Sequence, residues 1–126
     1  MPGRFDALHN LLKKDRSAAL EQLLDPASCS IKEPYAEDLN HAWYMVGDIY
    51  FKQGEFSLAL ESFLKSLDHR PTDVEAMMAI ANCASELGNP ALSEKYLRAS
   101  LKQSESAALF YNLGTALFDQ GKFGEA

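Results

Sequence analysis

The chain has 126 residues, of which 47% are hydrophobic and 24% are charged, and its formal net charge is −6. This hydrophobic content excludes a disordered chain, and no apolar run reaches the roughly 18 residues that a membrane span requires. The negative charge argues against nucleic acid as a partner, because nucleic acid binds to basic surfaces. The N-terminus lacks the apolar stretch of a secretory signal, so we expect a cytoplasmic protein.

Residues 1–25 are predicted to form two short helices. Apolar residues recur at helical spacing from Phe5 to about Lys14, and a second run extends to Leu24, where Asp25 and Pro26 end it. Two interpretations remain open: an N-terminal helical cap with a polar outer face, or a degenerate copy of the hairpins that follow. We favour the cap, because the terminal units of repeat proteins are atypical.

Residues 26–37 are predicted to form a loop, because prolines and serines interrupt any helical periodicity there. Tyr35 is the one large side chain of this segment. We therefore expect Tyr35 to anchor the loop on the hydrophobic core.

Residues 38–73 are predicted to form an antiparallel helical hairpin. The first helix carries apolar residues at helical spacing from Trp43 to Tyr50, and Gly54 provides a helix stop. The second helix begins near Phe56 and ends before Pro71. The two contacting faces hold small residues at Gly47 and Ala59 and large ones at Trp43 and Phe63. Such a hairpin leaves apolar faces uncovered, so it requires stacked neighbours.

The hairpin is repeated along the chain. Gly47, Gly54 and Phe63 correspond to Ala81, Gly88 and Leu97, each 34 residues later. The glycine positions recur once more as Gly114 and Gly121. The second unit spans 74–106 and the third, truncated unit spans 107–126. By this register Ala126 lies in the first turn of a further helix, so we expect the natural protein to continue into more repeats. Leu113, Leu117 and Phe118 are then candidates for an exposed apolar surface that could support a homo-oligomer.

Helix caps are predicted at the start of each unit. Asp38 or Asn40 is expected to cap the first unit, and Thr72 with Glu75 matches the spacing of a capping box before the second. Ser104 or Ser106 is expected to cap the third unit.

No catalytic or metal-binding set is recognisable. His9, His41 and His69 lie far apart without ligand spacing, and Cys29 and Cys83 form no metal or redox motif. The glycines do not follow a strand, so they do not form a phosphate-binding loop. We therefore expect a protein that is not an enzyme and that holds no metal or cofactor.

The pattern Trp43-x2-Val46-Gly47-x2-Tyr50, followed by Ala59-x3-Phe63 and Pro71, resembles the tetratricopeptide repeat. The second unit departs from the family pattern at Ala84, Ser93 and Glu105. The resemblance implies an all-α, right-handed α-solenoid of stacked antiparallel helix hairpins. It also implies a protein–protein interaction scaffold, which binds a partner peptide in the concave groove formed by the first helix of each unit.

The resemblance assigns groove positions by register. They are His41, Tyr44, Asp48, Phe51 and Lys52 in the first unit; Glu75, Met78, Asn82, Ser85 and Glu86 in the second; and Ala108, Tyr111, Asn112, Thr115, Phe118 and Asp119 in the third. This predicts an aromatic, mildly acidic groove for a peptide with apolar and basic residues. The alternative is that the four aromatic residues serve packing between repeats.

The sequence also allows other functions to be weighed. Members of the family that clamp the carboxylate tails of chaperones carry Lys and Asn on the first repeat and Lys and Arg on the third. This chain has Tyr44 and Asp48, and Ala108 and Asn112, at those places, so the cationic residues are missing and we do not expect such an adaptor. The chain could instead be the N-terminal region of a larger enzyme or signalling protein, or an architectural module that self-associates.

Overall fold

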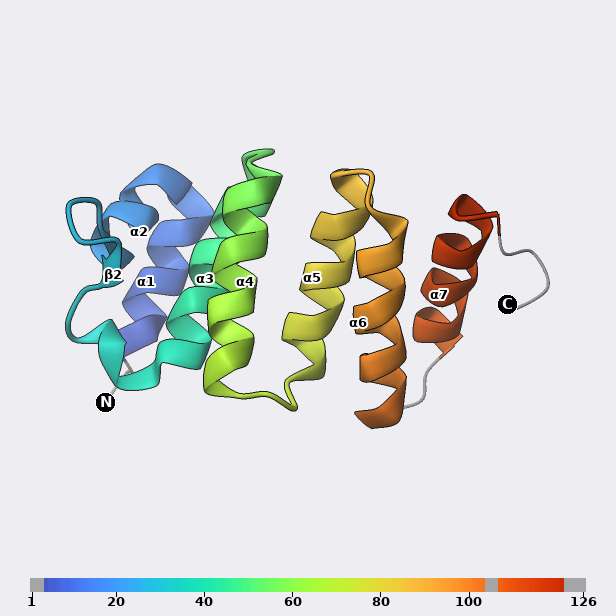
Figure 1. The fold of residues 1–126 in the computed structure, drawn as a ribbon. Helices are drawn as coiled ribbons and strands as arrows, with labels where there is room; N and C mark the ends of the chain where they lie inside the picture. Colours follow the sequence, from blue (N-terminus) through green and yellow to red (C-terminus); the bar gives the residue numbers. More distant parts are fainter. Residues whose placement is uncertain (1–3, 104–106, 122–126) are drawn as a thin grey trace.

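The structure is a computed structural model that describes residues 4–103 and 107–121. Its elements follow the chain in this order: α1 (Arg4–Lys14), α2 (Arg16–Leu23), β1 (Leu24–Asp25), β2 (Ser30–Ile31), the 3-10 helix η1 (Tyr35–Asp38), α3 (Leu39–Lys52), α4 (Phe56–His69), α5 (Val74–Glu86), α6 (Pro90–Gln103) and α7 (Ala107–Asp119). Consecutive helices pack side by side, and the stack extends from α3 to α7 (Figure 1). The predicted all-α solenoid of antiparallel helix hairpins is confirmed. None of the described helices is long and apolar enough to cross a membrane.

The turns inside the hairpins depend on glycine. Gly54 follows α3 with a φ of 79°, Gly88 follows α5 with 73°, and Gly121 follows α7 with 79°. Glycine reaches this left-handed region without the steric penalty that a Cβ atom imposes. Gly54 and Gly88 therefore lie where the chain reverses between the two helices of a hairpin, and Gly121 lies at the predicted helix stop after α7.

The close approach of α3 and α4 depends on a different glycine. A Cβ atom placed on Gly47 would lie 2.7 Å from Cδ1 and from Cε1 of Phe63. Phe63 is itself only 2% exposed, so its ring fills the space that the glycine leaves. In the second repeat the corresponding pair is Ala81 and Leu97, which are both buried. Both repeats thus place a small residue on the first helix opposite a large one on the second. In the second repeat the small residue is larger and the large residue is smaller than in the first.

Asn40 ties three elements together. Its side-chain amide donates to the backbone oxygen of Ser66 (2.9 Å), to Oγ of Ser66 (3.1 Å) and to Oδ2 of Asp73 (3.1 Å). Oγ of Ser66 in turn donates to the backbone oxygen of Asn40 (2.7 Å). Because Ser66 is fully buried, these bonds satisfy polar groups that would otherwise be costly to bury.

The observed caps correct one prediction. Asp38 caps α3 by accepting from the backbone N–H of His41 (3.1 Å), which selects it over Asn40. The predicted capping box of Thr72 and Glu75 is wrong: Asp73 caps α5 and accepts from the N–H groups of Glu75 and Ala76. Asp73 also accepts a hydrogen bond from the side-chain amide of Asn40. This contact with α3 favours a helix cap at Asp73 over one at Thr72. Ser104 and Ser106 lie outside the described residues.

The segment 26–37 is less irregular than predicted. β1 and β2 form an antiparallel pair with Leu24 opposite Ile31 and Asp25 opposite Ser30, and η1 follows them. The carboxylate of Asp25 accepts from the N–H of Ala27 (2.9 Å), which stabilises the connecting turn. The expectation for Tyr35 is confirmed, since it packs against the N-terminal core with its ring centroid 5.4 Å from that of Phe5.

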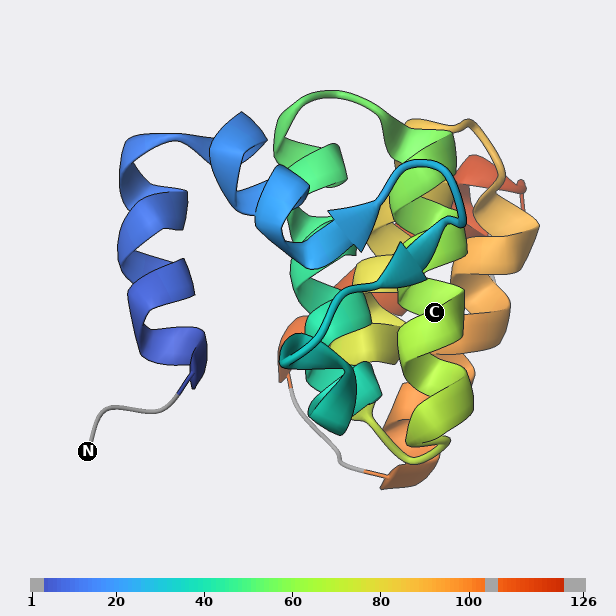
Figure 2. The same ribbon diagram turned by 90° about the vertical axis from the view of Figure 1, so that its left-hand side faces the viewer.

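The N-terminal hairpin packs on the first repeat. Leu8 of α1 and Ala19 and Leu23 of α2 are fully buried in one cluster with residues of α3. In Figure 2, α3 lies between α1 and α4, so α1 stands on the side of α3 that faces away from α4. The hairpin therefore covers the end of the solenoid and also flanks the face formed by the first helices of the repeats.

Candidate binding groove

Two adjoining hollows lie along α3 and α5. The larger one, which we call the N-terminal cleft, has a volume of about 900 Å³ and is lined by His9, Leu12, Lys13, Arg16, Asn40, His41, Tyr44, Met45, Asp48, Lys52, Arg70, Thr72, Asp73, Val74 and Glu75. The smaller one, the aromatic hollow, has a volume of about 280 Å³ and is lined by Tyr44, Asp48, Phe51, Phe63, Glu75, Met78, Ala79 and Asn82. Both hollows share Tyr44, Asp48 and Glu75, so they form one continuous depression.

Tyr44 stands where the two hollows meet. Its ring is half-buried and lies 5.2 Å from the ring of Phe63, centroid to centroid. Burial raises the pKa of the Tyr44 hydroxyl, and the nearby carboxylates of Glu75, Asp48 and Asp73 raise it further. The phenol is therefore protonated at neutral pH and can donate or accept a hydrogen bond. Tyr44 thus packs on Phe63 within the first repeat and also lines both hollows.

The charges on α3 are partly paired. Nζ of Lys52 lies 2.9 Å from Oδ2 of Asp48, one turn earlier on the same helix. The pair is partly exposed, so solvent weakens it and a competing charge on a ligand can replace either partner. Glu75, on the opposite wall, is exposed at the start of α5. The wall formed by α3 and α5 around the aromatic hollow thus offers carboxylates beside aromatic rings.

His41 forms the contact between α1 and α3. Its ring meets that of Phe5 edge to face at 4.4 Å and lies 5.5 Å from the ring of His9, both measured between centroids. Burial lowers the pKa of His41; the charge of Asp38 opposes this shift, and His9 adds a smaller lowering. The neutral imidazole is the form that this packing favours.

The structure gathers most of the predicted groove residues of the first two repeats. His41, Tyr44, Asp48, Lys52 and Glu75 line the N-terminal cleft, and Phe51, Met78 and Asn82 line the aromatic hollow. Glu86 lies near the end of α5 and lines neither hollow. Phe51 also packs edge to face on Phe56 of the same repeat, at 5.1 Å between centroids. Tyr44 and Phe51 both pack against the cluster that joins Phe63 to Ile80 of the second repeat, which agrees with the packing alternative.

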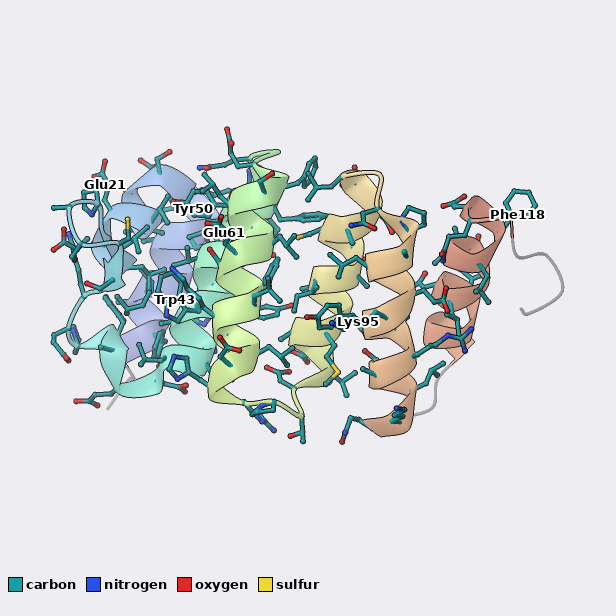
Figure 3. The ribbon with its side chains drawn as sticks, in the orientation of Figure 1. Glu21, Trp43, Tyr50, Glu61, Lys95 and Phe118 are labelled. Carbon is teal, nitrogen blue, oxygen red and sulfur yellow. The ribbon has the colours of Figure 1, made fainter. Side chains whose placement is uncertain are left out.

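The predicted residues of the third repeat lie on α7, and those whose side chains the structure describes line neither hollow. Tyr111 is 75% exposed and Phe118 is 65% exposed, and Figure 3 shows Phe118 projecting from the side of α7 that is turned away from α6. Asn112 is half-buried, while Thr115 and Asp119 are exposed. The expectation that Leu113 and Leu117 are exposed is wrong, because they pack with Ala81 and Leu97 in a buried cluster. The face of α7 that carries both leucines is the one turned toward the preceding repeat.

Sequence reasoning missed the contribution of the N-terminal hairpin. His9, Leu12, Lys13 and Arg16 line the cleft although they precede the repeats. As a result the charged lining of the cleft has four cationic and three anionic side chains, whereas the repeat positions alone predicted an acidic groove. The run Lys13-Lys14-Asp15-Arg16 was a visible signal of a basic surface, but no local pattern places it opposite α5.

The rest of the described chain offers no reactive constellation. No three His, Cys, Asp or Glu side chains gather there to hold a metal ion. Cys83 is fully buried, and burial raises the pKa of its thiol to about 12, so it is protonated and inert. Cys29 is exposed and free. What the arrangement provides is a concave surface with convergent polar and aromatic groups.

The profile of the tetratricopeptide repeat family matches residues 44–108 and again residues 78–126, together more than half of the chain. This chain belongs to the tetratricopeptide repeat family. Repeats of this family are generally protein-interaction modules and are typically non-catalytic. No curated protein matches the chain. The family profile begins at Tyr44, so the hairpin of α1 and α2 lies outside the matched tetratricopeptide repeats.

Proposed function

We propose that this tetratricopeptide repeat protein binds an extended segment of a partner protein along α3 and α5. The observation that carries the proposal is the continuous depression formed by the N-terminal cleft and the aromatic hollow, because it combines aromatic walls with exposed polar groups. A surface of this kind can bury apolar side chains of a ligand and fix its orientation by hydrogen bonds.

The lining residues suggest how such a segment is held. Tyr44, Phe51 and Met78 offer apolar contact area to a side chain of the partner. Asn82 is exposed at the same hollow, and its amide can both donate to and accept from an extended peptide backbone. The carboxylates of Asp48 and Glu75 favour a basic residue beside the apolar one.

The proposal is tested by capturing partners from a lysate with three baits. They are the unaltered protein, a variant with Glu75→Ala and Asn82→Ala, and a control with Leu58→Ala. Both residues of the double variant are exposed on α5, so the fold should persist, whereas Leu58 is 42% exposed on α4 and lines neither hollow. We expect a partner that the first and third baits retain and that the double variant binds about tenfold more weakly. Equal retention by all three would place the binding surface outside the groove.

Self-association is a second candidate function, which the exposed aromatic residues Tyr111 and Phe118 of α7 favour. Light scattering over a range of protein concentrations tests it directly. A rise in mass that Tyr111→Ser abolishes would support self-association through α7, and a constant monomer mass would exclude it.

A further inference from the structure

The walls of the N-terminal cleft carry opposite charge. On the side of α1 and the start of α2, the lining residues with permanent charge are Lys13 and Arg16, both cationic and both exposed. Neither side chain makes a hydrogen bond or ion pair within residues 4–103 and 107–121. Their charges are therefore available to a ligand without first breaking an internal contact.

The cationic surface continues beyond the cleft. A further hollow of about 360 Å³ lies at the junction of α1 and α2. Its charged lining residues are Lys13, Lys14 and Arg16 with the single carboxylate of Asp15, and Gln53 joins them from the end of α3. Lys52, also near the end of α3, lines the cleft itself. Several cations thus surround the end of the cleft where α1 and α3 finish.

The opposite wall is acidic at the start of α5. Asp73 and Glu75 line the cleft at the start of α5, and Glu75 continues into the aromatic hollow together with Asp48. Arg70, in the connection before α5, is the exception on this side. The ion pair of Lys52 and Asp48 lies on α3, between the α1 wall and the α5 wall.

We propose that the wall formed by the end of α1 and the start of α2 binds anionic groups through Lys13 and Arg16, and that the partner segment is bipolar. Its acidic residues lie against Lys13 and Arg16, and its basic or apolar residues lie against Glu75 and the aromatic hollow. This inference rests on the proposed function and deepens it.

The physical reason is charge complementarity across a shared cleft. A segment that fills the cleft contacts both walls, so a uniformly basic segment would be repelled by α1 and a uniformly acidic one by α5. Only a segment with both signs in the matching order meets favourable charge on each side. Specificity therefore comes from the N-terminal hairpin as well as from the repeats.

The experiment is a selection from a phage-displayed library of random peptides on four immobilised proteins. These are the unaltered protein; the reversal variant Lys13→Glu, Arg16→Glu; the acidic-wall variant Asp48→Asn, Glu75→Gln; and the control Lys95→Glu, Lys102→Glu. The control makes the same change in net charge at two exposed lysines of α6, and Figure 3 labels one of them, Lys95. Circular dichroism and the melting temperature of each variant establish that it is folded before selection.

We expect the unaltered protein and the control to select peptides that carry both an acidic and a basic residue at a preferred separation. Peptides selected by the reversal variant should lose the preference for acidic residues and keep the preference for apolar and basic ones. Peptides selected by the acidic-wall variant should lose the preference for basic residues and keep the preference for acidic ones. In a resynthesised peptide, changing its Asp or Glu to the amide should weaken binding about 3- to 10-fold at low salt, and much less on the reversal variant.

The outcomes separate the two proposals. Peptides selected without acidic enrichment, or selected identically by the reversal variant and the control, would overturn the role of α1 and leave the groove in place. If the unaltered protein selects no peptide above background, the proposed function fails as well.

Discussion

The contact between Gly47 and Phe63 predicts that Gly47→Ala destabilises the protein when residue 63 is Phe and stabilises it when residue 63 is Leu. A Cβ atom at position 47 would be 2.7 Å from the Phe63 ring, whereas ordinary contact begins at 3.4 Å, so ring or helix has to move by about 0.7 Å. The ring is 2% exposed and cannot swing into solvent. Overpacking of this kind costs about 1–3 kcal/mol, and replacing a helical glycine by alanine returns about 1 kcal/mol.

Gly47→Ala should therefore lower the free energy of unfolding by about 1 kcal/mol in the natural protein. In a Phe63→Leu background the ring is gone, and the same substitution should raise that free energy by up to about 1 kcal/mol through helix propensity. The double variant reproduces the Ala81 and Leu97 pair of the second repeat, which the fold already accommodates. Gly47→Leu, with no room for its side chain, should lower stability by about 1–3 kcal/mol.

The assay is urea-induced unfolding followed by far-UV circular dichroism, with midpoints compared at a common slope. Ala81→Gly is the matched control, and it should destabilise by about 1 kcal/mol because it loses helix propensity and relieves no clash. If Gly47→Ala were equally stabilising with Phe63 and with Leu at position 63, the ring would not occupy the space beside the glycine, and the assigned helix pairing would be wrong.

Three further predictions concern the hydrogen bonds and the burial of single side chains. Asn40→Ala removes the hydrogen bonds that join α3 to α4 and to the cap of α5, and it leaves the buried oxygens of Ser66 with fewer donors. The free energy of unfolding should therefore fall by about 1–3 kcal/mol. A urea midpoint within error of the natural protein would refute this. Because burial lowers the pKa of His41 from its ordinary value of 6.5, the unfolded chain binds its proton more readily, and stability should decline as the pH falls through 6.5 toward the folded-state pKa. In a series of urea midpoints against pH, His41→Gln should flatten this decline, and an unchanged slope would contradict the assignment. Iodoacetamide should label Cys29 in the folded protein and Cys83 only after unfolding, and mass spectrometry showing equal labelling rates in the folded state would contradict the burial of Cys83.

The helical hairpins could be predicted because their signals are local. The spacing of Trp43, Val46 and Tyr50 defines one face of α3, and Gly54 ends the helix through a backbone conformation that concerns one residue. The same signals recur at Gly88 and Gly121, so one correctly interpreted unit predicts the next. The small residue at Gly47 also indicated a close helix contact, and Phe63 provides it.

Two other predictions were wrong because local sequence signals could not decide between alternatives. Thr72 and Asp73 are both good helix caps by residue type, and the choice fell on Asp73, which also accepts a hydrogen bond from Asn40, 33 residues earlier. The exposure of Leu113 and Leu117 was misjudged because periodicity shows that one helix face is apolar but does not show which neighbour covers it. In both cases the deciding contact joins residues that are distant in sequence.

By itself, the sequence determined the class of fold, the hairpin register and the family, since helix periodicity, turn glycines and repeat spacing act over a few residues and then recur. The tertiary structure decided where the N-terminal hairpin lies, and with it the chemistry of the groove. Lys13 and Arg16 face the same cleft as Glu75 only because Leu8 and Leu23 are buried against α3 and Phe5 meets His41. Packing between segments far apart in the chain creates that arrangement, and no short-range pattern encodes it.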